Sequence, residues 1–165
     1  NVMKRVFFLA GWLWVSQQAL LAQGNKSVFI ELGANGMGLS ANYDARFSKS
    51  DKGLGYRVGV GFVPGMDLII IQTSGFLTIP VGLNYLAGKA PHYLEAGLGS
   101  TYVNGVSVKV FGSETGKANA LGWVPSLGYR YATAGKGLQL RIIFSPFIGS
   151  GGGAYYGGIS FGFKF

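Results

Sequence analysis

Charged side chains recur at alternate positions in several segments of this chain, between apolar neighbours. Glu31 lies within VFIELG and Arg57 lies within GYRVGV. If these segments are strands, the charged residues share the polar face, which is the interior of a closed sheet with an apolar exterior. The charged residues that alternation places inside are Glu31, Asp44, Arg46, Arg57, Glu95, Arg130, Arg141 and Lys164.

A charge in a narrow interior is costly unless it is paired. We therefore predict that these eight side chains form a salt-bridge and hydrogen-bond network. Five of them are positive and three are negative, and this excess leaves two interpretations open. The network is a packed polar core, or its surplus charge binds an anion or favours anion leakage along a thin water path.

A catalytic or metal site would need residues that the sequence does not supply. His92 is the only histidine, and there is no cysteine, which excludes a thiolate site and a histidine pair for a metal. Serine–histidine chemistry on lipid would need His92, in the turn AGKAPH, to meet Ser48, Ser50 or another serine, and no spacing indicates this. We expect His92 to be an interfacial turn residue, and no catalytic residue, cofactor or metal.

Two glycine-rich stretches resemble phosphate-binding loops only in composition. GSETGKA at 112–118 is one residue shorter between its glycines than a P-loop, and Ala118 stands where a serine or threonine would hold magnesium. GSGGGA at 149–154 has no lysine. We predict that both are loops.

Eight segments alternate between apolar and polar residues, as strands with one apolar face do. They cover roughly 28–35, 39–47, 55–62, 76–86, 94–102, 121–131, 138–147 and 155–165. At about 8–11 residues, each is long enough to cross a bilayer as a tilted strand. The chain is 48% hydrophobic and only 12% charged, about half the charged fraction of an average soluble domain.

The connections between these segments alternate in length. SKSDKGL, AGKAPH and ATAGKG are short and carry lysine, whereas Val63–Gly75 and Val103–Ala120 are long. We expect a tight turn at Gly36–Gly38 and a glycine-rich loop at Ile148–Ala154. Short turns at one end and longer loops at the other are typical of outer-membrane barrels, whose short turns are periplasmic. Aromatic residues near both ends of the segments predict two interfacial girdles.

A soluble eight-stranded calyx also alternates, but its apolar face lines a cavity and its polar face meets water. Here the polar face is rich in glycine, which suits the inside of a narrow barrel better than a water-facing surface. The predicted fold is therefore all-β, an eight-stranded antiparallel up-and-down transmembrane β-barrel. Pro80 and Pro125 fall inside predicted strands, and we expect bulges or bends there.

The beginning of the sequence has the pattern of a secretory signal peptide. In MKRVFFLAGWLWVSQQALLAQ a basic start precedes an apolar stretch and a polar end. We expect a signal peptide over 1–22, cleaved at or near Ala22, and a barrel over 23–165. The formal charge of the whole sequence is +8, but its basic residues are scattered, so no nucleic-acid partner is expected.

Several stretches resemble the small outer-membrane β-barrel proteins common in Bacteroidota. They are FIELGANGMGLSANYDARF, TIPVGLNYLAGKAPHYLEAGLGSTY, GYRY and the terminal Phe165. The resemblance implies an eight-stranded barrel of mostly unassigned role, more distantly similar to the OmpX and OmpA barrel class. It also implies that Phe165, at the end of an alternating last strand, is an assembly signal for the barrel assembly machinery.

Together these features predict a monomeric barrel in the bacterial outer membrane with periplasmic termini. Its expected role is structural or in surface interaction with an extracellular or envelope protein, through the loops Val63–Gly75 and Val103–Ala120, without a general pore. Two alternatives remain open: a narrow conduit for small anions or apolar molecules, and a lipid-modifying enzyme that uses His92. The other expected partner is outer-membrane lipid.

Overall fold

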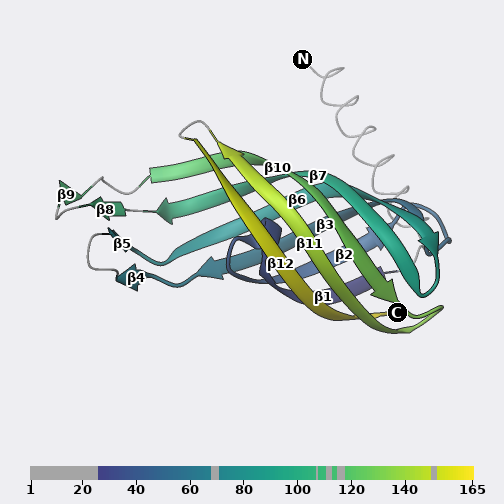
Figure 1. The fold of residues 1–165 in the computed structure, drawn as a ribbon. Helices are drawn as coiled ribbons and strands as arrows, with labels where there is room; N and C mark the ends of the chain where they lie inside the picture. Colours follow the sequence, from purple (N-terminus) through teal and green to yellow (C-terminus); the bar gives the residue numbers. More distant parts are fainter. Residues whose placement is uncertain (1–25, 68–70, 107, 111–112, 115–117, 150–151) are drawn as a thin grey trace, which may run out of the picture.

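The computed structural model describes residues 26–67, 71–106, 108–110, 113–114, 118–149 and 152–165. Eight strands close into one barrel in the order β1-β12-β11-β10-β7-β6-β3-β2, and each is antiparallel to both neighbours (Figure 1). The strands are β1 (Lys26–Gly33), β2 (Leu39–Arg46), β3 (Gly53–Val63), β6 (Phe76–Lys89), β7 (His92–Val106), β10 (Ala118–Ala132), β11 (Gly137–Gly149) and β12 (Gly152–Lys164). The predicted eight-stranded antiparallel barrel is confirmed. The expected signal peptide, 1–22, lies outside the described residues.

The two ends of the barrel differ in their connections. We call one the turn end, because the short links β2–β3, β6–β7 and β10–β11 lie there together with Lys26 and Phe165. The backbones of Lys26 and Phe165 exchange hydrogen bonds of 3.3 and 2.9 Å between N and O. The chain end is therefore part of the sheet, and β1 and β12 close the barrel without a free edge.

The opposite end, which we call the loop end, carries a second sheet. The long connections contain β4 (Met66–Asp67), β5 (Ile71–Thr73), β8 (Val108–Val110) and β9 (Ser113–Glu114). These pair in the order β4-β5-β8-β9 and project beyond the barrel (Figure 1). The two long loops are thus joined to each other by the antiparallel pair β5–β8.

Side chains alternate between the two faces of the barrel wall. Leu94, Leu127 and Ile142 point outward and are 65, 66 and 64% exposed, while the charged residues of the same strands are buried. This is the reverse of a soluble calyx. Ala45 is buried although alternation places it on the outer face; the ring of its cross-strand partner Tyr56 lies 6.2 and 5.5 Å from those of Tyr43 and Phe47, which flank Ala45 on β2 and just beyond it. Among the described residues, no helix has the length and apolar character needed to cross a membrane.

The connection between β1 and β2 differs from the expected tight turn at Gly36–Gly38. It contains a short 3₁₀ helix, η1 (Ala34–Gly36), whose residues are all buried. Gly33, Ala34 and Met37 have φ of 80°, 48° and 65°, so the chain reverses direction through three residues with positive φ. Ala34, expected on the apolar outer face of β1, lies in η1 instead.

Of the bulges or bends expected at Pro80 and Pro125, the structure shows no bulge. Pairing between β3 and β6 is interrupted between Val58↔Val81 and Gly61↔Thr78, yet the register is the same on both sides. The β10–β11 pair is interrupted in the same way around Pro125. Each proline stays paired on its other side. The wall accommodates the missing N–H by a local loss of pairing rather than by an extra residue.

Candidate functional site

The lumen contains a chain of ion pairs in which arginines and acidic residues alternate. We call it the ion ladder. It consists, in order, of Arg57, Glu31, Arg141, Glu95, Arg130, Asp44 and Arg46. All seven side chains are nearly inaccessible to solvent. Because every acid lies between two arginines, each carboxylate is compensated, and the ladder contains one arginine more than it has acids.

Glu95 lies at the centre of this ladder. Its Oε2 accepts hydrogen bonds from Arg130 Nε at 2.8 Å and Arg141 Nε at 3.0 Å. Its Oε1 accepts from Arg141 Nη2 at 2.5 Å and from Asn84 Nδ2 at 3.1 Å. The inward positions that follow Glu95 on β7 are Gly97 and Gly99, where an added Cβ would lie 2.5 Å from Ser126 Oγ and from the carbonyl oxygen of Val81, respectively.

The two ends of the ladder are held in different ways. Arg46 Nη2 donates to Asp44 at 2.6 Å, and its Nη1 donates to the carbonyl of Gly53 at 3.0 Å. At the other end, Arg57 donates to Glu31 at 2.7 Å and to Asn42 at 2.9 Å. The guanidinium carbons of Arg57 and Arg141 lie 5.3 and 4.5 Å from the centre of the Phe29 ring, so this buried ring also packs against both cations.

Lys164 is the predicted network member that does not join the ladder. Its Nζ lies 2.9 Å from Asp51 Oδ1, in the β2–β3 link at the turn end. Asp51 was not predicted, because it falls outside the alternating segments. Next to this pair, Leu86, Tyr93 and Ala132 form a small apolar cluster inside the barrel. The turn end of the lumen is therefore closed by one ion pair and one apolar layer.

The helix η1 closes the other half of the lumen. The hydroxyl of Thr78 donates to the carbonyl of Gly36, and the hydroxyl of Thr101 donates to the carbonyl of Asn35, both at 2.8 Å. These bonds tie η1 to β6 and β7 and satisfy two carbonyls that would otherwise be buried without a partner. With the ion ladder below it, η1 leaves the lumen filled along the described residues.

The structure thus brings together seven of the eight charged residues that alternation placed inside. It also adds amides that the sequence analysis did not single out, chiefly Asn42, Asn84 and Gln139, all buried. The same alternation could have indicated them, since they occupy polar positions of β2, β6 and β11. Which residue each amide would contact could not be read from spacing.

His92 lies at the turn end on the outer face of the barrel. Its Nδ1 is 2.5 Å from the hydroxyl oxygen of Tyr129, and its ring packs near those of Tyr129 and Tyr131. The hydrogen-bond partner of His92 is thus a tyrosine rather than the serine that lipid hydrolysis would require. Among the described residues, no cluster of His, Asp or Glu is arranged to hold a metal ion.

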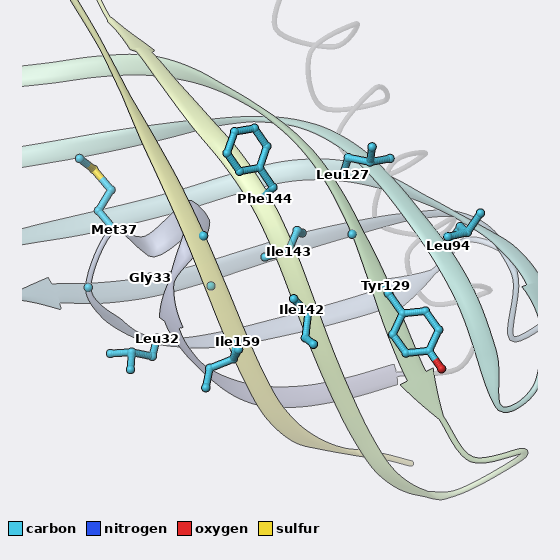
Figure 2. A pocket seen from close by; sticks show the side chains of 14 residues that line it. Leu32, Gly33, Met37, Leu94, Leu127, Tyr129, Ile142, Ile143, Phe144 and Ile159 are labelled. Carbon is cyan, nitrogen blue, oxygen red and sulfur yellow. The ribbon is translucent and has the colours of Figure 1, made fainter.

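The outer wall has an apolar groove of about 830 Å³ across β10, β11 and β12 (Figure 2). Gly157, where an added Cβ would meet no atom within 4 Å, leaves room for the groove on β12, whereas Gly128 and Gly158 face the lumen side of the wall. The exposed or partly exposed side chains around it are Leu32, Met37, Leu94, Leu127, Tyr129, Ile142, Phe144 and Ile159. The groove is open to its surroundings, so it offers an apolar surface rather than an enclosed pocket, on the face that would contact lipid.

No protein-family model matches this sequence, and no curated protein matches it. Solved structures do. The chain is similar to Ail, the attachment invasion locus protein of Yersinia pestis, with TM-score 0.60, 12% identity and coverage of 86% of this chain and 99% of that one. It is also similar to the N-terminal β-barrel domain of Pseudomonas aeruginosa OprF, with TM-score 0.56, 12% identity and coverage of 86% and 96%.

Neisserial surface protein A is a third structure of the same kind, with TM-score 0.50, 15% identity and coverage of 85% of this chain and 93% of that one. Identities this low show a shared fold and nothing finer. A closed barrel of eight antiparallel strands is common to this chain and to these proteins. The chain has the fold of the small eight-stranded outer-membrane β-barrels.

Proposed function

We propose that the chain is an integral protein of the bacterial outer membrane that acts in surface interaction through its loop end, with its turn end and both termini in the periplasm. The observation that carries this proposal is the contrast between the two parts of the molecule. The lumen is filled by the ion ladder and η1, whereas the long loops pair through β5 and β8 into a sheet that projects beyond the barrel.

The filled lumen supports a role that does not depend on transport. A pore needs a continuous water path, and here seven buried charged side chains and η1 occupy the interior. The barrel then serves as an anchor that holds the β4-β5-β8-β9 sheet at the cell surface. Its sequence resemblance to small outer-membrane barrels of Bacteroidota suggests the same kind of host.

An impermeant thiol-reactive crosslinker on intact cells tests both the orientation and the role. We expect a cysteine at the exposed Asn104, near the loop end, to react and to give a discrete crosslinked product. A cysteine at Lys52, at the turn end, should not react until the cells are opened. Replacing 66–73 with a Gly-Ser segment of equal length should remove the crosslinked product, because β5 can then no longer pair with β8.

Two results would overturn this proposal. Labelling of Lys52→Cys but not of Asn104→Cys on intact cells would reverse the orientation. Steady single-channel conductance of the purified barrel in planar bilayers would show that the lumen is an open conduit. In that case the ion ladder would line a path rather than close it.

We also propose that Phe165 is an assembly signal. It is exposed on the outer face, and its backbone completes the β1–β12 closure. Deleting Phe165 should lower the amount of folded barrel in the outer membrane far more than Phe165→Trp, which keeps a terminal aromatic. The measure is the fraction of protein that migrates in the compact, heat-modifiable form on an unboiled gel. Equal compact fractions for the deletion and the wild type would contradict this role.

A further inference from the structure

The charges of the described barrel are sorted by residue type. The arginines Arg46, Arg57, Arg130 and Arg141 are all in the lumen. The lysines of the barrel strands and short turns all lie at the turn end, and they are Lys26, Lys49, Lys52, Lys89, Lys136 and Lys164. Four of these, Lys49, Lys52, Lys89 and Lys136, have exposed side chains. We call these four, with the exposed His92, the basic rim.

Acidic side chains do not neutralise the basic rim. Of the acids whose side chains the structure describes, Glu31, Asp44 and Glu95 are inside the ion ladder. The fourth, Asp51, forms an ion pair with Lys164. The rim therefore presents positive charge to whatever lies around the turn end, and it would attract anions there.

Lys89 and His92 are the part of the rim that adjoins the groove. They are cross-strand partners at the ends of β6 and β7, and alternation places both on the outer face. His92 is in turn the cross-strand partner of Tyr131 and is hydrogen-bonded to Tyr129. When the Tyr129 hydroxyl donates to Nδ1, the imidazole proton is on Nε2, which is left as a donor.

The apolar groove begins next to Lys89 and His92. Leu94 is two positions beyond His92 on β7, it is the cross-strand partner of Tyr129, and both line the groove. From there the groove runs past Ile142 and Ile159 toward Leu32 and Met37 (Figure 2). A cationic and hydrogen-bonding group thus adjoins one end of an apolar groove.

We propose that this part of the wall binds one anionic phospholipid of the leaflet at the turn end, with its phosphate at Lys89 and His92 and an acyl chain in the groove. The inference rests on the proposed placement of the barrel in a membrane. Charge selects the headgroup, since lysines near a membrane surface attract anionic lipid. The apolar groove explains why the ligand is a lipid rather than free phosphate, because free phosphate would leave it unoccupied.

Native mass spectrometry of the folded barrel, released from mixed micelles, tests this directly. The probes are phosphatidylglycerol and phosphatidylcholine with identical acyl chains, and inorganic phosphate as the headgroup-like ion without a chain. We expect the wild type to retain one phosphatidylglycerol in preference to phosphatidylcholine, and inorganic phosphate at millimolar concentration to displace little of it. Lys89→Gln should weaken retention of phosphatidylglycerol about fivefold, the effect of one lysine charge near a membrane surface.

The matched controls separate charge from the groove. Lys52→Gln removes the same charge from another turn and should leave retention nearly unchanged. Gly157→Leu fills the groove, and the backbone tolerates it because an added Cβ meets no atom within 4 Å. It should weaken the binding of both lipids while leaving the compact form intact.

Equal retention of the two lipids by the wild type would overturn the inference, as would equal losses for Lys89→Gln and Lys52→Gln. Displacement by inorganic phosphate alone would show an anion site without lipid selectivity and would also overturn it. Folding into phosphatidylcholine vesicles is the separate measure of membrane insertion. A barrel that inserts there but shows no lipid preference refutes only this inference, whereas failure to insert refutes the proposed function.

Discussion

Replacing Glu95 with alanine should destabilise the barrel by about 3–5 kcal/mol, the usual cost of removing one partner from a buried ion pair. Glu95 compensates Arg130 and Arg141, both almost fully buried. Without its carboxylate, two guanidinium groups would remain in the lumen with only Asp44 and Glu31 to oppose them. The free energy of unfolding can be measured by urea titration of the vesicle-folded barrel, read from the compact form on unboiled gels.

Two further variants make this expectation specific. Glu95→Gln keeps the shape and one acceptor oxygen of the side chain but removes its charge. Its free energy of unfolding should therefore lie between those of Glu95→Ala and the wild type. Lys164→Met replaces a buried ammonium group with an apolar side chain and leaves Asp51, whose side chain is 24% exposed and open to water, so it should cost less than Glu95→Ala. If Glu95→Ala costs no more than Lys164→Met, the ion ladder does not stabilise the fold.

An arginine in place of Ile142 should destabilise the membrane-inserted barrel by about 2–4 kcal/mol, as a charge on the lipid face near mid-membrane does. Ile142 is 64% exposed and lies near the middle of β11. Its side chain points away from the lumen, so an arginine there would have no carboxylate to pair with. The same urea titration in vesicles gives the free energy.

The matched control is an arginine at Tyr155, near the loop end of β12. Tyr155 is 80% exposed, and a charge close to the membrane interface costs only about 0–1 kcal/mol. A lipid-facing wall requires a dependence on depth, in which Ile142→Arg loses much more free energy of unfolding than Tyr155→Arg. Equal tolerance of both arginines would mean that the outer face of β11 does not contact lipid.

The architecture of the barrel was predictable because its signal is local. Two-residue alternation shows, from each strand by itself, which side chains share a face. The length of the connections then indicates which ends of the strands meet. That is why the eight strands and the inward positions of Glu31, Glu95 and Arg141 could be placed from the sequence.

We expected bulges or bends at Pro80 and Pro125, and the bulges were wrong for a reason that the sequence does not contain. A proline removes one N–H, and a sheet can respond with an extra residue or with a gap in the pairing. The choice depends on the neighbouring strand. Here β3 and β11 keep their registers across the gaps.

The sequence by itself determined the wall of this barrel, which side chains it encloses and how many charges the lumen must compensate. Only the tertiary structure decided how these charges pair, because their partners come from distant strands. Arg130 contacts Asp44 across 86 positions of the chain. Strand tilt and stagger set which inward residues reach the same level of a barrel, and a two-residue period carries no information on stagger. Three further contacts depend on where separate strands bring their ends, and the sequence did not predict them for the same reason. Lys164 pairs with Asp51 of a turn, η1 enters the lumen, and the two long loops form one sheet.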